Sequence, residues 1–214
     1  MIFKSKYHKK KFKQIVLKSL SKNNNIVSAT IVGSLNSNKK EIGDIDIVLI
    51  SKTINKNYIN KVNKVIKQIE LNKYFLNPDY KILINNSFGP IKYNYKKYVV
   101  FHLMYYDIEA HKNHVIESPF TCYDWERSKN YIGKSLKEIY PVGKIYLEDF
   151  LKSRRSISEY LKILSSKSIT QKIYSFNKEK YIIRGKKIKL SEIQLVEVCH
   201  HIIKFLTINV IKYE

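Results

Sequence analysis

Two aspartates separated by one residue begin an apolar segment, and a glycine-serine pair precedes them. The aspartates are Asp44 and Asp46, followed by Ile47-Val-Leu-Ile, and nine residues separate them from Gly33-Ser34. In a strand, side chains at i and i+2 lie on one face, so the two carboxylates would point together while the isoleucines enter a core. Adjacent carboxylates repel each other unless a cation lies between them. Carboxylate oxygens on one strand, with positions open for phosphates, predict a site for one or two Mg²⁺ ions.

The glycine-serine pair follows an apolar segment, residues 26–32, that reads as a strand. A residue without Cβ lets the backbone approach a phosphate, and a hydroxyl can donate a hydrogen bond to a phosphate oxygen. We therefore expect Gly33 and Ser34 to bind the phosphates of a metal-bound triphosphate. The polar residues 35–43 could add one helical turn, whose first amides would also face the phosphates.

This arrangement resembles the nucleotidyltransferase superfamily that includes DNA polymerase beta. Its members carry a hydrophobic strand, Gly-Ser or Gly-Gly, a spacer, and Asp-x-Asp in a second strand; the matching residues here are Gly33, Ser34, Asp44 and Asp46. The resemblance is close over residues 26–51 and looser over the first hundred. It implies a mixed sheet with flanking helices, Mg²⁺ as cofactor, and transfer of a nucleoside monophosphate from ATP or another triphosphate, with release of pyrophosphate.

Members of this superfamily usually carry a third carboxylate on an adjoining strand, and this chain departs from that pattern. The expected strand 98–106 contains His102 as its strongly polar side chain, and Asp107 follows it. Imidazole titrates near neutrality and can accept a proton or bind a metal, so His102 is the candidate catalytic base. A purely structural histidine, with Asp107 as the third ligand, is the alternative.

The remaining pattern predicts an α+β chain with a catalytic domain, residues 1–120, and a mainly helical domain, residues 121–214. Apolar spacing and turn residues predict helices over 7–22, 55–76, 145–165 and 190–211, and strands over 26–32, 44–51, 81–84, 91–95 and 98–106. Residues 172–189 alternate weakly and suggest a hairpin that turns at Arg184-Gly185-Lys186. Arg154 and Arg155 either face the triphosphate or acceptor, or lie in solvent.

The charge balance points to anionic partners. The chain of 214 residues has 40 basic and 18 acidic side chains, a net charge of +22, which would attract nucleic acid. Most of this charge is lysine, and the abundance of Asn, Ile and Tyr is also typical of an AT-rich coding sequence. Because arginine is the usual residue for bidentate phosphate recognition, a lysine excess leaves a nucleic-acid partner open.

Several acceptors therefore remain. An RNA acceptor such as a transfer RNA end would make the protein a processing enzyme or the toxin of a toxin-antitoxin pair. A small molecule, as in antibiotic nucleotidyltransferases, or a protein hydroxyl also fits. A non-catalytic RNA-binding or nucleotide-sensing module is the alternative outside enzymes.

The apolar segments, the first residues and the cysteines of the sequence indicate the cellular compartment in which we expect the protein. No apolar run approaches the ~20 residues needed to cross a bilayer, and the first residues lack the apolar part of a secretory signal. We expect a cytoplasmic protein without a membrane partner. Cys122 and Cys199 are too few for a disulfide framework, and His111 and His114 lack a third metal ligand at suitable spacing.

Overall fold

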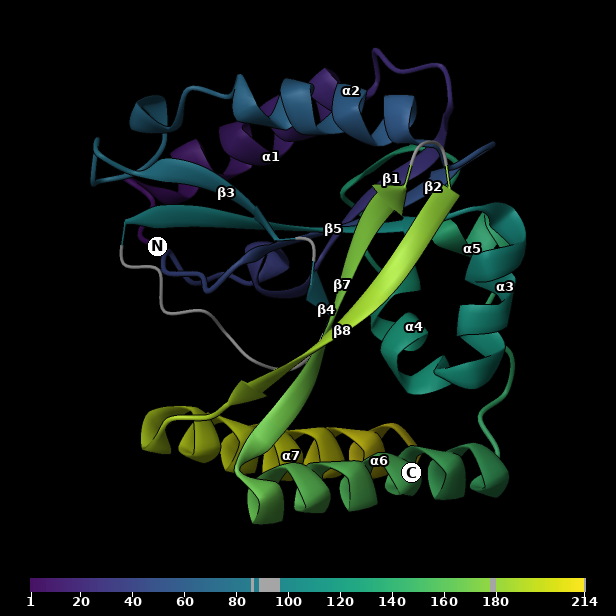
Figure 1. Cartoon of the computed structure of the whole chain (residues 1–214). Coiled ribbons are helices and arrows are strands. Elements are labelled where there is room, and N and C mark those ends of the chain that lie inside the picture. The colour runs from purple at the N-terminus through teal and green to yellow at the C-terminus, as the bar shows by residue number, and fades with distance from the viewer. Residues whose placement is uncertain (86, 89–96, 178–179, 214) are drawn as a thin grey trace.

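The chain folds into an α+β structure with two sheets (Figure 1). The computed structural model describes residues 1–85, 87–88, 97–177 and 180–213. A mixed five-stranded sheet is flanked by helices, and a three-stranded sheet and two long helices form the C-terminal part. The predicted fold class is confirmed at this level.

The five-stranded sheet has the order β3-β5-β2-β1-β6. The strands of this sheet are β1 (Ile26–Val32), β2 (Ile45–Ser51), β3 (Lys81–Asn85), β5 (Tyr98–Tyr106) and β6 (Tyr131–Gly133). The strand β1 is antiparallel to β2 and β6, whereas β2 and β3 are parallel to β5. The strands predicted at 26–32, 44–51, 81–84 and 98–106 are confirmed, with Asp44 one residue before β2. The strand predicted at 91–95 lies outside the described residues.

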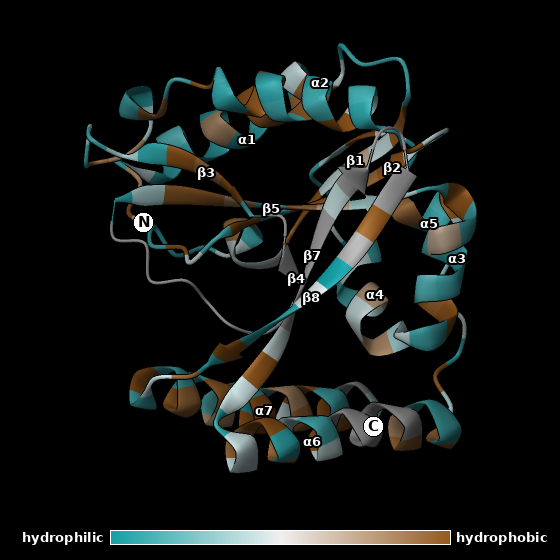
Figure 2. Ribbon diagram, viewed as in Figure 1, coloured by the Kyte–Doolittle hydropathy of each residue, from teal (hydrophilic) through white to brown (hydrophobic). Residues whose placement is uncertain are grey.

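Helices cover the sheet, and α1 (Lys6–Leu20) lies beside α2 (Lys56–Lys67) (Figure 1). The main core joins α1 and α2 to alternate residues of β2, namely Ile45, Ile47 and Leu49. A smaller core contains Val48 and Ile50 from the opposite face of β2, together with Leu136 and Trp125. In Figure 2 the solvent-facing side of α2 is hydrophilic and the strands beneath it are largely hydrophobic. Because side chains alternate along a strand, Asp46 lies on the face away from α1 and α2.

The smaller core is covered by three short helices that follow β5. They are α3 (Ile108–Glu117), α4 (Pro119–Glu126) and α5 (Leu136–Ile139). Between α4 and α5, β6 pairs with β1, so residues beyond the predicted boundary at 120 return to the first sheet. Two ten-residue strands also lie within residues 121–214, alongside the helices predicted there.

The helix predicted over 55–76 is too long. The helix α2 ends at Lys67, and a 3₁₀ turn, η2 (Leu71–Lys73), follows it. The chain turns because its next apolar side chains enter the core; Phe75 is fully buried and stacks on Phe3 with 4.3 Å between ring centroids. A straight helix would carry Phe75 about 12 Å further along the helix axis, away from this contact.

The C-terminal part consists of α6 (Leu147–Ser166), β7 (Ser168–Asn177), β8 (Lys180–Lys189) and α7 (Glu192–Tyr213). The helices α6 and α7 lie side by side, and β7 pairs with both β8 and β4 (Ser87–Phe88). The predicted turn at Arg184-Gly185-Lys186 is wrong, since Gly185 lies inside β8 opposite Lys172. A Cβ atom at Gly185 would lie 3.0 Å from Cγ2 of Thr170, so the glycine allows close cross-strand packing. The side chains of Arg154 and Arg155 lie outside what the structure describes.

The helix α7 differs from the expectation that no segment suits a bilayer. Residues Glu192–Ile211 are long and apolar enough, by length and composition alone, to cross a bilayer, and 11% of this segment is buried. The helix also packs on α6 through the buried side chains of Val198 and Ile202, and the core helices of soluble proteins share such length and composition.

Candidate active site

The turn after β1 lies directly against the start of β2. Val32 pairs with Asp46 in the antiparallel β1–β2 register, and the 3₁₀ turn η1 (Gly33–Asn36) begins at the next residue. Gly33 has a φ of +69°, in the left-handed region that favours glycine. A Cβ atom at this position would overlap with Oδ2 of Asp46. Glycine at this position therefore allows both the left-handed backbone conformation and the close approach of the Asp46 carboxylate.

The side chain of Ser34 in this turn contacts the backbone of Asp44. The Ser34 hydroxyl donates a hydrogen bond of 3.1 Å to the carbonyl oxygen of Asp44. Gly33 is exposed, and Ser34, Asp44 and Asp46 are half-buried, so the site is accessible from solvent. The structure thus brings together the four residues that the sequence pattern selected.

A buried lysine from α1 holds the loop after the turn. The Lys9 ammonium donates to the carbonyl oxygens of Ser37 and Lys39, each at 2.8 Å, and of Ser34 at 3.4 Å. Lys9 is only 5% exposed. Its burial, together with the nearby charge of Lys13, lowers the pKa of Lys9 to about 8. Because one side chain satisfies three carbonyls of the loop, it fixes the path of the chain around the candidate site.

Three further polar side chains hold the same turn. The Asn36 amide donates to the carbonyl oxygen of Ile31 at 2.8 Å and to the Ser128 hydroxyl at 3.0 Å. Ser128 donates to the same Ile31 carbonyl at 2.6 Å, and the Asn130 amide donates to Oδ1 of Asn36 at 2.8 Å. The sequence reasoning missed Lys9, Asn36, Ser128 and Asn130. Asn36 and Ser128 lie 92 positions apart in the sequence, so no local pattern reveals their contact.

His102 lies beside Asp46 on the neighbouring strand. The two residues are Cα partners in the parallel β2–β5 register, and Nδ1 of His102 is 3.2 Å from Oδ1 of Asp46. The side chains are 21% and 20% exposed. Nε2 of His102 is buried and has no hydrogen-bond partner among the described residues. The histidine therefore occupies the adjoining-strand position where the resemblance led us to expect a third carboxylate.

Asp107 does not take that position. It caps the N-terminus of α3, where its Oδ1 accepts a hydrogen bond of 2.7 Å from the Ala110 amide. Asp107 lies five positions after His102 in the sequence, which corresponds to about 16 Å along an extended chain. Asp107 follows β5 and satisfies a helix amide, a common role for aspartate. The alternative with Asp107 as third metal ligand is not supported.

The residues present fit a magnesium ion carried by a nucleotide. Within the described part of the chain, no three His, Cys, Asp or Glu side chains form a group that could hold a metal. Magnesium in phosphoryl-transfer sites is usually bound by one or two carboxylates plus substrate phosphates, so such a group is not required. Among the described residues, no lysine or arginine pairs with Asp46; its ion-pair partner is His102.

The histidines of α3 belong to the packing of the smaller core. His111 is 1% exposed, and burial together with His114 lowers its pKa to about 4. The His114 ring lies 5.2 Å from those of Tyr106 and Trp125, and burial also lowers its pKa. Both rings are therefore neutral at neutral pH and fill space beside the sheet.

Comparisons with models of protein families, with curated proteins and with solved structures find no match for this chain. The function is therefore inferred from the motif and from the geometry of the site.

Proposed function

We propose that the protein is a magnesium-dependent nucleotidyltransferase of the superfamily that includes DNA polymerase beta. It would transfer a nucleoside monophosphate from a nucleoside triphosphate to an acceptor hydroxyl and release pyrophosphate. The observation that carries the proposal is the contact between the glycine-serine turn and the aspartates. Gly33 lies against the Asp46 carboxylate, and Ser34 binds the Asp44 carbonyl. A turn suited to phosphates and carboxylates suited to magnesium therefore meet in one accessible place.

The chain's own residues have distinct roles in this reaction. The Asp44 and Asp46 carboxylates would hold the magnesium, which neutralises charge on the transferred and leaving oxygens when bound. Gly33 lets the phosphates approach the backbone. The single hydroxyl proton of Ser34 is donated to the Asp44 carbonyl here, so this hydroxyl would rotate to donate to a phosphate oxygen when the nucleotide binds. The Lys9 hydrogen bonds keep the loop in position before the substrate arrives, so its ordering costs less on binding.

His102 is the candidate general base. With a proton on Nδ1, the ring donates to Oδ1 of Asp46 and leaves the lone pair of Nε2 able to accept the proton of an acceptor hydroxyl. The same hydrogen bond would orient the Asp46 carboxylate toward the metal. A strand movement or side-chain rotation must expose Nε2, because this atom is buried here.

One observation favours a second function, in which the protein binds and senses nucleotides but catalyses no nucleotidyl transfer. His102 stands where the resemblance implies a third carboxylate, and the described residues hold no three-ligand metal group. Such a module would bind nucleotide and release no pyrophosphate.

If the protein is an enzyme, three classes of acceptor remain to be distinguished: RNA, a small molecule and a protein.

The experiment incubates the protein with each α-labelled triphosphate, magnesium, and fractions of cellular RNA, small molecules or proteins. Asp46→Asn removes one negative charge with little change of shape, and Asp79→Asn is the matched control because Asp79 is exposed and lies before β3. We expect magnesium-dependent label transfer from wild type and Asp79→Asn, and none from Asp46→Asn. Unchanged transfer by Asp46→Asn would overturn the site, and absence of pyrophosphate release with every triphosphate would overturn the reaction.

A further inference from the structure

The basic residues are distributed unevenly along the chain. Residues 1–100 contain 20 basic and 5 acidic side chains, whereas residues 101–150 contain 6 basic and 8 acidic ones. A coding bias toward lysine would act on both segments. It does not explain why one segment is strongly positive and the next is slightly negative, so the position of the lysines in the fold carries information.

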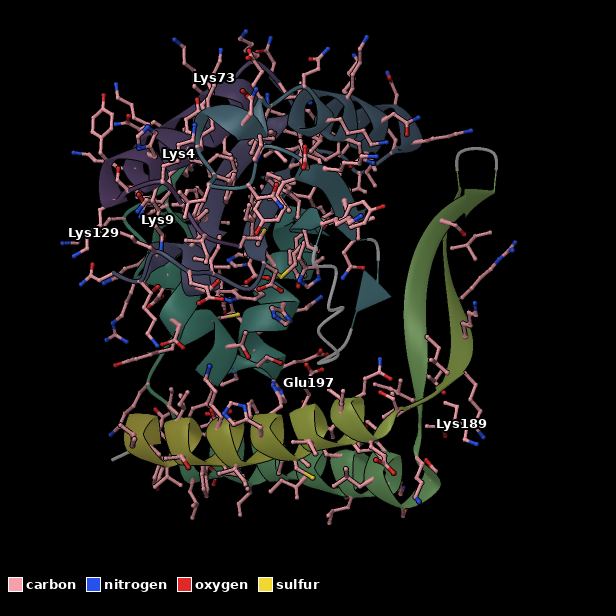
Figure 3. All side chains as sticks on the ribbon, turned by 90° about the vertical axis from the view of Figure 1, so that its left-hand side faces the viewer. Lys4, Lys9, Lys73, Lys129, Lys189 and Glu197 are labelled. Atoms are coloured by element: carbon pink, nitrogen blue, oxygen red, sulfur yellow. The ribbon has the colours of Figure 1, made fainter. Side chains whose placement is uncertain are left out.

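The helices α1 and α2 form the most one-sided part of this charge. Together they contain ten lysines and no acidic residue. Lys9 is turned inward to the loop, and most of the others are exposed. In Figure 3 many side chains with nitrogen atoms at their tips extend outward around this helical layer, near the labelled Lys73. The field of this layer would concentrate polyanions at its surface.

A groove between α1 and α2 lies within this layer. It consists of a cavity of about 650 Å³ and a smaller neighbour of about 260 Å³, which share Ser19, Lys22, Val65 and Gln68. The larger cavity also contains Lys61, Lys64 and three consecutive asparagines, residues 23–25, and the smaller one contains Lys73. Glu70 is the acid that lines it, and it pairs with Lys73 at 2.8 Å. We call these two cavities together the α1–α2 groove.

We propose that the α1–α2 groove binds the phosphate backbone of a single-stranded nucleic acid. Lysine ammonium groups supply charge, and the asparagine and glutamine amides supply hydrogen-bond donors for phosphate and sugar oxygens. Proteins that bind single strands without sequence preference use a positively charged groove that follows the phosphate backbone. The lysine-lined α1–α2 groove has this character, so it favours a single strand, and the test below compares a single strand with a duplex.

The surface is unlike one that inserts into a membrane. Helices that lie on anionic lipids place large apolar side chains between their basic residues. On α1 and α2 the exposed large hydrophobic residue among those described is Tyr7, at 62% exposure, and no aliphatic side chain accompanies it. These features favour nucleic acid over a lipid surface.

This surface is separate from the candidate active site. The helices α1 and α2 pack on the sheet face that carries Ile45, Ile47 and Leu49, and Asp46 lies on the other face. Binding in the groove thus needs neither magnesium nor the Asp46 carboxylate, and it can be tested independently of nucleotidyl transfer.

The test measures binding of labelled 20-nucleotide oligouridylate and oligothymidylate in EDTA over a series of salt concentrations. The groove variant is K22Q/K61Q/K64Q, and the matched control, K134Q/K137Q/K144Q, removes the same charge from exposed lysines between β6 and α6. We expect the groove variant to bind at least tenfold more weakly. Its slope of log K against log salt should become shallower by about 2, which is ~0.7 for each of three lost phosphate contacts. The control should keep most of the wild-type slope.

Further variants and ligands show whether any loss of binding is specific to the groove and to single-stranded nucleic acid. K22R/K61R/K64R should restore binding, and Asp46→Asn should bind like wild type; unfolding curves verify that each variant is folded. Equal losses in the groove and control variants would overturn the proposal, since they would indicate general attraction alone. Tighter binding of a 20-base-pair duplex, or of phosphatidylserine vesicles with the same lysine dependence, would also overturn it. Because the assay contains no magnesium, failure here leaves the proposed transfer reaction untouched.

Discussion

At the scale of single residues, Asp46 links the turn after β1 to the histidine of the neighbouring strand β5. Its carboxylate lies against Gly33 on one side and 3.2 Å from His102 on the other. The sequence predicted Asp46 and Gly33 because strand alternation and turn chemistry are local properties. It placed His102 on the right strand, but the pairing of His102 with Asp46 depends on the β2–β5 register, which no local pattern encodes.

Gly33→Ala should disrupt the site through two effects. The alanine must adopt a φ of +69°, which costs about 1–2 kcal/mol, and its Cβ displaces the Asp46 carboxylate. We expect the free energy of unfolding, measured in urea, to fall by about 1–2 kcal/mol, with transfer activity reduced more than tenfold. Gly143→Ala is the control, because a Cβ atom added there would meet no other atom within 4 Å. Full activity of Gly33→Ala would show that the turn does not shape the site.

His102→Ala should reveal whether this histidine takes up the acceptor proton. Loss of a general base typically lowers kcat about 10²–10⁴-fold and removes the matching limb of the pH-rate profile. His200→Ala, at an exposed position of α7, should change neither. A merely structural histidine would instead yield a lower stability with the same shape of pH profile.

At the scale of elements, the site depends on how α1 and the segment after α4 hold the turn η1. Besides the bonds that its own Ser34 and Asn36 make, the turn is anchored by Lys9 from α1 and by Ser128 and Asn130 after α4. The sequence predicted most helices and strands, because their apolar spacing is regular. It extended α2 too far because buried Ile69 and Phe75 continue that spacing from outside the helix.

Lys9→Met should loosen the loop more than the loss of a surface charge would. Methionine keeps the apolar stem but leaves three loop carbonyls without their donor, at a cost of about 3 kcal/mol. The neighbouring Lys10→Met, on the exposed side of the same helix, should change stability by less than about 0.5 kcal/mol. Urea unfolding of both variants makes the comparison. Equal stability of the two variants would show that the buried ammonium does not hold the loop.

The histidines of α3 predict a loss of stability in mild acid. The folded pKa of His111 is lowered to about 4, below its ordinary value of 6.5, so the unfolded chain binds a proton first as pH falls. Stability is therefore fully present above pH 6.5 and declines toward pH 4, by up to about 3 kcal/mol for this group. Unfolding curves between pH 7.5 and 4 should show a smaller decline for His111→Leu than for wild type or His200→Leu. An identical decline in all three would contradict this assignment.

At the scale of the whole molecule, chain segments far apart in sequence meet to build the sheets. Residues 131–133 return to pair with β1, and β7 pairs with β4. The sequence indicated an α+β chain with a helical C-terminus, but these long-range pairings depend on tertiary packing and could not be predicted from periodicity. The net charge of +22 follows from the sequence alone. That several of the lysines line the α1–α2 groove could be recognised only from the folded structure.

That net charge also determines how the central claim must be tested. A strongly positive protein attracts ATP without any specific site, and added magnesium weakens that attraction because it neutralises the phosphates. Binding through the aspartates would respond in the opposite direction, since magnesium links the carboxylates to the phosphates. The sign of the magnesium effect thus separates the two kinds of binding.

The most direct measurement is the affinity for a non-hydrolysable ATP analogue, titrated calorimetrically with and without magnesium at constant ionic strength, for wild type and Asp46→Asn. We expect magnesium to strengthen binding of the analogue by wild type at least tenfold and not to strengthen its binding by Asp46→Asn. The same magnesium effect in both proteins would contradict the claim that these aspartates hold a metal-bound nucleotide.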